Sequence, residues 1–162
     1  MLGFMRAAIS LLTAASLFAS SAFAAGPKPK ICFTKAEESA EMLVRGGLRL
    51  REGAAGCDKP PYEMHTQPLW DQVEQKYGSQ FKRQTDVRRG AFVREFAKDA
   101  ENQVQAWDGR TVLYYRYYPL SGVYCVQIKK DLEGFLKTGW PAFAKKATLY
   151  RIPVEDDYKP CG

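Results

Sequence analysis

Histidine is nearly absent from this sequence of 162 residues, which contains only His65. A metal or catalytic site that needs two histidines is therefore excluded, and no Cys-x-x-Cys-His haem attachment motif is present. The chain also lacks a nucleophile-elbow serine, a phosphate-binding glycine loop and a metalloprotease helix motif. We therefore expect no metal and no cofactor, and no functional role for His65 in its loop.

Long hydrophobic runs are scarce as well. The main apolar segment, residues 7–18, follows Arg6 and precedes Ala22-Phe23-Ala24, a small-x-small cleavage site. This arrangement is typical of a signal peptide, and the segment is shorter than the about 20 residues that span a bilayer. No cysteine follows it at a lipoprotein-like position. We expect residues 1–24 to be removed near Ala24, which leaves a periplasmic or secreted protein that does not span the membrane.

A long run of one charge sign is also missing. The chain carries 24 basic and 18 acidic residues, a formal net charge of +6. Loss of Arg6 with the signal peptide would leave about +5. Because the basic residues are scattered, we expect no nucleic-acid partner, and we take an envelope protein or an anionic envelope surface as the possible partner.

Cysteine occurs four times, and no two cysteines are close in sequence: Cys32, Cys57, Cys125 and Cys161. All four follow the expected cleavage site. An even number of cysteines in an oxidising compartment predicts two disulfides, whereas the wide spacing disfavours a metal site.

The segment after the first cysteine gives the clearest helix signal. Thr34 and Glu37 match a capping box, and apolar residues then recur at helical spacing. We expect one straight helix over about residues 35–56. Gly46-Gly47 in its middle costs about 1 kcal/mol per glycine relative to alanine. This pair either breaks the helix or lets a neighbouring helix approach closely, and we favour the second interpretation.

The expected helix limits how the cysteines pair. A straight helix over 35–56 is about 33 Å long, whereas a disulfide tolerates at most about 7 Å between Cα atoms. Cys32–Cys57 is then impossible unless the helix breaks. Either Cys57–Cys125 forms with Cys32–Cys161, or the crossed pairing forms. We favour Cys57–Cys125.

The rest of the chain also favours helices. Amphipathic segments predict them at 68–78, 80–107, 120–137 and 142–147. Residues 111–118 are ambiguous, because their β-branched and aromatic side chains favour a strand. The helical pattern that follows favours a helix, which we adopt. Residues 25–31 and 148–162 are expected to be irregular. The fold class is therefore all-α, a single domain over 25–162 that forms a bundle of four or five helices with two disulfides.

Two arginines are candidate ligand-binding residues, because a helical wheel places Arg51 and Arg89 within the apolar faces of their helices. A buried guanidinium needs a carboxylate or carbonyl partner. The alternative is that each aliphatic stem packs while the charged end reaches water. If both are buried, they line a small anion-binding recess between the helices at 35–56 and 80–107.

An aromatic and basic cluster supplies the other ligand-binding candidates: Tyr114, Tyr115, Arg116 and Tyr118, with Tyr117 and Tyr124 nearby. Interleaved aromatic and basic side chains stack on sugars or bases. In an exported protein, contact with a glycan or a peptide is the more reasonable expectation. Packing in the core is the competing explanation for the same tyrosines.

A carboxylate pair offers an enzymatic alternative. Glu95 and Asp99 are four residues apart in the helix expected at 80–107, with Arg88 on the same side. Two neighbouring acids divide the acid and base roles in glycoside hydrolysis. Acids at this spacing are also common on solvated helix faces, so we assign no catalytic residues in the main interpretation.

Four features of the chain together resemble a known class of proteins. They are the N-terminal segment, Thr34-x-x-Glu37, the segment from Leu48 to Gly53 with Cys57, and Tyr124-Cys125. They are similar to small exported helical proteins of unassigned function from Gram-negative bacteria, particularly alphaproteobacteria. The resemblance implies a periplasmic setting and no catalytic residues. We expect a non-enzymatic binding or envelope-associated module, and the alternative is a small glycan hydrolase of the cell envelope.

Overall fold

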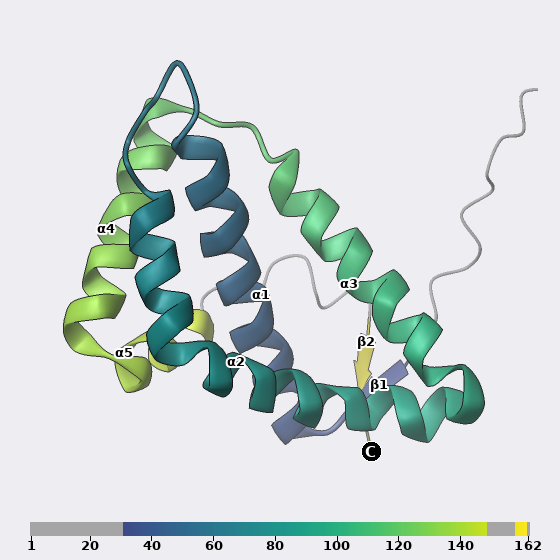
Figure 1. Ribbon diagram of the computed structural model, residues 1–162. Helices are drawn as coiled ribbons and strands as arrows, with labels where there is room; N and C mark the ends of the chain where they lie inside the picture. The colour runs from purple at the N-terminus through teal and green to yellow at the C-terminus, as the bar shows by residue number, and fades with distance from the viewer. Residues whose placement is uncertain (1–30, 149–157, 162) are drawn as a thin grey trace, which may run out of the picture.

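The computed structural model describes residues 31–148 and 158–161, so the expected signal peptide lies outside the described residues. The prediction of an all-α fold is confirmed. The helices are α1 (Lys35–Cys57), α2 (Gln67–Phe96), α3 (Ala100–Arg116), α4 (Gly122–Thr138) and α5 (Trp140–Ala147). Figure 1 shows α1 in the middle of the molecule, with α4 and α5 on one side and α3 on the other.

Helix α1 is unbroken, and its start has the expected chemistry. The Thr34 side chain accepts a hydrogen bond from the Glu37 backbone N–H, and the Glu37 carboxylate accepts one from the Thr34 N–H at 2.8 Å. Gly47 lies inside the helix against α2. A Cβ atom at this position would lie 2.5 Å from Cε1 of Phe81. The glycine therefore permits close packing of the two helices, as expected.

Helix α2 begins where the prediction placed a helix, but it is much longer than predicted. The chain does not end a helix at Gly78 but continues as one helix from Gln67 to Phe96. A 3-10 turn, η1 (Ala97–Asp99), then separates α2 from α3, and Ala97 adopts a φ of 45°. The prediction of one continuous helix over 80–107 is therefore wrong. The turn after Phe96 does not interrupt the spacing of apolar residues in the sequence, because α2 and α3 bury their apolar side chains in one shared core.

That shared core explains why the spacing of apolar residues does not reveal the break between α2 and α3. Phe92 comes from α2, whereas Val104 and Trp107 come from α3, and all three are buried in one cluster. The rings of Phe92 and Trp107 meet edge to face at 5.5 Å between centroids. The ambiguous stretch 111–118 is helical as far as Arg116, so the helical interpretation holds for most of it.

The expectation that both ends are irregular is wrong for two short segments. Strand β1 (Ile31–Phe33) pairs in parallel with β2 (Tyr158–Pro160). Strands of three residues carry too little alternation to be detected in a sequence. Tertiary contacts hold them together, including the stacked rings of Phe33 and Tyr158 at 4.9 Å.

Both expected disulfides are present, Cys57–Cys125 and Cys32–Cys161. The first lies in the larger hydrophobic cluster, which α1, α2, α4 and α5 form together. The second joins β1 to the residue after β2, beside the smaller cluster of β1, α2 and α3. Each disulfide therefore ties together segments that are far apart in sequence.

Candidate functional site

Most of the exposed large hydrophobic side chains of the described residues gather in one short stretch. Six of the eight lie between residues 113 and 126, where α3 ends and α4 begins: Leu113, Tyr114, Tyr117, Tyr118, Val123 and Val126. We call these six residues the α3–α4 corner. Figure 1 shows this connection at the same end of the molecule as the loop between α1 and α2. Exposed apolar side chains that cluster in this way mark interaction surfaces.

Two tyrosines of the corner, Tyr114 and Tyr118, form a row of rings with the neighbouring Tyr124. The centroids of Tyr114 and Tyr118 are 6.2 Å apart, and those of Tyr118 and Tyr124 are 5.1 Å apart. Tyr115 contacts Tyr114 edge to face at 5.1 Å but is buried. Burial raises the pKa of Tyr115 to about 12. Of the predicted tyrosines, Tyr114 and Tyr118 therefore face solvent, whereas Tyr115 supports them from the core.

Of the two most exposed residues of the corner, Tyr117 belongs to the predicted aromatic cluster, whereas Val123 was not predicted. Tyr117 is 78% exposed and Val123 is 83% exposed. Val123 and Val126 lie on the side of α4 opposite the buried Cys125 and Ile128. An apolar residue on the outward face of an amphipathic helix is a signal that the sequence does contain.

The charged residues within this stretch of the chain have one sign. From residue 110 to 130 the chain has four basic residues and no acidic one: Arg110, Arg116, Lys129 and Lys130. The predicted Arg116 is exposed and donates from Nε to Oε2 of Glu52 at 3.0 Å. The guanidinium of Arg49 lies over the ring of Tyr124, 5.5 Å from its centroid. The corner therefore combines apolar rings with positive charge.

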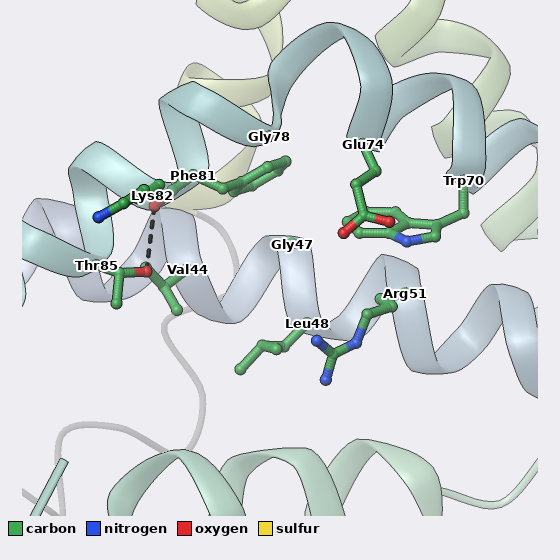
Figure 2. Close-up of a pocket in the computed structure, with 10 residues that line it drawn as sticks. All are labelled: Val44, Gly47, Leu48, Arg51, Trp70, Glu74, Gly78, Phe81, Lys82 and Thr85. Carbon is green, nitrogen blue, oxygen red and sulfur yellow. Dashed lines mark hydrogen bonds between the residues drawn. The ribbon is translucent and has the colours of Figure 1, made fainter. Parts of the chain in front are cut away.

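Arg51 lies elsewhere, at a cavity of about 180 Å³ between α1 and α2. Its side chain is 40% exposed and its Nη2 lies 2.8 Å from Oε1 of Glu52. Figure 2 shows Trp70, Glu74 and Phe81 extending from α2 toward α1 above this cavity. Arg51 is thus partly solvated, and it faces a small cavity of mixed polarity between α1 and α2.

Arg89 is not in an apolar face, because its neighbour Arg88 is the buried residue. Arg89 is 45% exposed and pairs with Glu101, whereas Arg88 is fully buried. Arg88 donates from Nη1 to Glu41 Oε2 at 3.1 Å and from Nη2 to Asp108 Oδ2 at 2.9 Å. The helical wheel places the wrong arginine inside, because it contains neither Glu41 of α1 nor Asp108 of α3, the partners that bury Arg88.

The predicted recess shared by Arg51 and Arg89 is not formed. Arg51 contacts Glu52, which also binds Arg116 at the end of α3. Arg89 contacts Glu101 at the beginning of α3. At 1.5 Å per residue, positions 101 and 116 of one helix are about 22 Å apart. The two arginines are therefore at opposite ends of α3.

The carboxylate pair is also arranged differently from the prediction. Glu95 lies in the last turn of α2 and Asp99 in η1, so the break after Phe96 separates them. Both are exposed, and neither lines the cavity beside Arg51. Hydrogen bonds from Gln103 and Asn102 lower the pKa of the Asp99 carboxyl. A general acid in glycoside hydrolysis needs a raised pKa instead.

Comparison with protein-family models, curated proteins and solved structures finds no match to this chain. In residues 31–148 and 158–161, no group of three or more histidine, cysteine or acidic side chains is placed to hold a metal ion. None of the described helices combines the length and apolarity needed to cross a membrane.

Proposed function

We propose that this protein is a non-enzymatic binding module of the cell envelope and that its α3–α4 corner docks on an anionic membrane surface. The carrying observation is the collection of six exposed apolar side chains in a stretch with four basic residues and no acidic one. The two disulfides are compatible with an exported protein in an oxidising compartment.

The chemistry of the corner suits the boundary between lipid and water. Tyrosine has an apolar ring and a polar hydroxyl, and it is enriched where membranes meet water. Lysine and arginine near an anionic lipid surface each contribute about 1 kcal/mol of attraction. Val123 and Tyr117 are the most exposed members, so they reach the acyl boundary first. Such a module lies on the membrane and does not span it.

The position of the two acids supports binding over hydrolysis. A glycosidase needs one carboxylic acid that keeps its proton near neutral pH. Asp99 is fully exposed and its lowered pKa keeps it ionised. Glu95 faces solvent at the end of a different helix. We therefore place the function at the corner and not at the carboxylates.

Vesicle sedimentation tests the proposal. The oxidised protein is mixed with vesicles of phosphatidylglycerol and phosphatidylethanolamine, or with vesicles of phosphatidylcholine alone. We expect binding to the anionic vesicles and weaker binding at high salt. Tyr117→Ser with Val123→Ser should weaken it about tenfold or more, because two apolar side chains lose their buried contact. Val87→Ser with Val93→Ser is the matched control, since both valines are exposed on α2.

The charge contribution is tested separately. Lys129→Glu with Lys130→Glu should reduce binding to anionic vesicles, whereas Lys35→Glu with Lys98→Glu makes an equal change in net charge away from the corner. Equal loss in the two double variants would show that only net charge matters and would contradict a localised surface. Absence of wild-type binding to anionic vesicles would overturn the proposal in favour of an envelope protein as the partner.

A further inference from the structure

The two disulfides have different access to solvent. Cys57 and Cys125 are both 0% exposed within the larger core cluster. Cys32 and Cys161 are each partly exposed. A thiolate must reach a sulfur atom before thiol–disulfide exchange takes place. Access alone therefore separates a protected disulfide from an open one.

Charged side chains of α2 give the two sulfur atoms of the open disulfide, Cys32–Cys161, different electrostatic surroundings. Nη2 of Arg94 lies 3.6 Å from Sγ of Cys161 and 3.9 Å from Sγ of Cys32. Oε1 of Glu95 lies 3.3 Å from Sγ of Cys32. A positive charge stabilises a thiolate, whereas a carboxylate beside the sulfur destabilises it. A negative charge is therefore accommodated better on Cys161 than on Cys32.

Arg94 is held in this position by other contacts. Its guanidinium binds both carboxylate oxygens of Glu37, at 2.8 and 2.9 Å, and the carbonyl oxygen of Cys32 at 2.7 Å. Glu37 is in turn the N3 residue of the capping box that begins α1. The hydrogen bonds to Arg94 lower the pKa of the Glu37 carboxyl, so the pair stays ionised at neutral pH. The charge beside the sulfur atoms is thus fixed by the fold.

We propose that Cys32–Cys161 is a thiol–disulfide exchange site, where an incoming thiol bonds to Cys32 and Cys161 leaves as a thiolate. The incoming thiolate attacks Sγ of Cys32 and forms a mixed disulfide. The bond between the two cysteines breaks, and its electron pair stays on Sγ of Cys161 beside Arg94. A second thiol then attacks the mixed disulfide, which releases Cys32 as a thiol and the reagent as its own disulfide.

The surrounding contacts make this exchange reversible. Tyr158 stacks on Phe33, and its hydroxyl donates to Oε1 of Glu38 at 2.9 Å. The backbone N–H of Cys161 donates to the carbonyl of Phe33 at 2.9 Å. These contacts do not depend on the sulfur–sulfur bond. They keep β2 beside β1 after reduction, so that the two thiols remain close enough to reoxidise.

The order of opening is tested on the wild-type protein with reduced glutathione. Samples are quenched with acid at intervals, alkylated and mapped by mass spectrometry. We expect Cys32 and Cys161 to be alkylated while Cys57–Cys125 stays intact, with rates that differ about tenfold or more. Opening of both disulfides at the same rate, or of Cys57–Cys125 first, would overturn the proposal. The expected intermediate is a mixed disulfide between glutathione and Cys32, which should appear before any between glutathione and Cys161.

The direction of exchange is tested with single thiols. The Cys32→Ser variant leaves Cys161 as a free thiol, and the Cys161→Ser variant leaves Cys32 as a free thiol. Alkylation by iodoacetamide is followed against pH. We expect the Cys161 thiol to have the lower pKa, and Arg94→Gln should raise it, whereas Arg89→Gln on the same helix should not. A lower pKa for the Cys32 thiol, or no effect of Arg94→Gln, would overturn the assigned direction.

Discussion

Replacement of Arg88 by methionine is the most direct test of how helices α1, α2 and α3 are held together. Arg88 comes from α2 and is fully buried between Glu41 of α1 and Asp108 of α3. Glu41 is also fully buried, and its Oε1 accepts a hydrogen bond from Nε1 of Trp107 at 2.8 Å. Arg88→Met keeps a long side chain in the core but removes the charge and both hydrogen-bond contacts.

The expected cost follows from the carboxylate that is left behind. Removal of one partner of a buried ion pair costs about 3–5 kcal/mol, because the other charge stays buried with fewer partners. Glu41 retains Arg45, which places the expected value toward the lower end, at about 3 kcal/mol. Domains of this size have a free energy of unfolding of about 5–15 kcal/mol. The substitution therefore removes a large fraction of the stability.

The loss in free energy of unfolding is measured by urea denaturation, followed by circular dichroism with both disulfides intact. The matched control is Arg89→Met at the next position of the same helix. Its exposed pair with Glu101 is expected to contribute about 0–1 kcal/mol. Equal destabilisation by the two substitutions would refute the reasoning, since it would mean that burial of Arg88 does not set the energetic cost.

Three further outcomes are expected. Gly47→Ala should destabilise by about 1–3 kcal/mol, because its Cβ would lie 2.5 Å from Phe81, whereas Gly109→Ala has nothing within 4 Å and should be neutral or stabilising in the same urea assay. Burial alone raises the pKa of Glu41, but the adjacent arginines hold it below its ordinary value of 4.5. Stability should therefore fall as the pH drops below 4.5, and urea midpoints should show a smaller drop for Glu41→Gln. Tyr115 ionises near 12 when folded and near 10.0 when unfolded, so stability should fall between these values, and less in Tyr115→Phe.

Local chemistry determined most of what the sequence revealed. The capping box at Thr34 and Glu37 and the helical spacing of apolar residues after it depend on neighbours within one or two turns. Helix α1 follows from them directly. The disulfide pairing was limited to two possibilities by the length of that helix, and Cys57–Cys125 is the favoured bridge that the structure contains.

The tertiary structure decided where helices end and which charges are buried. The break after Phe96 leaves the apolar pattern unchanged, because α2 and α3 bury their side chains in the same cluster. Arg88 is buried because its partners come from α1 and α3, 47 and 20 residues away in the chain. A helical wheel of α2 contains neither partner, so it does not separate Arg88 from Arg89.

The candidate site shows the same division. The sequence alone determined that tyrosines and basic residues lie together near residue 116, and that no acid interrupts them. Only the packing of α3 and α4 against α1 and α2 decided that Tyr115 is buried while Tyr114, Tyr118 and Val123 face solvent. The physical reason is that a side chain is exposed when no other segment covers it, and covering segments are distant in sequence.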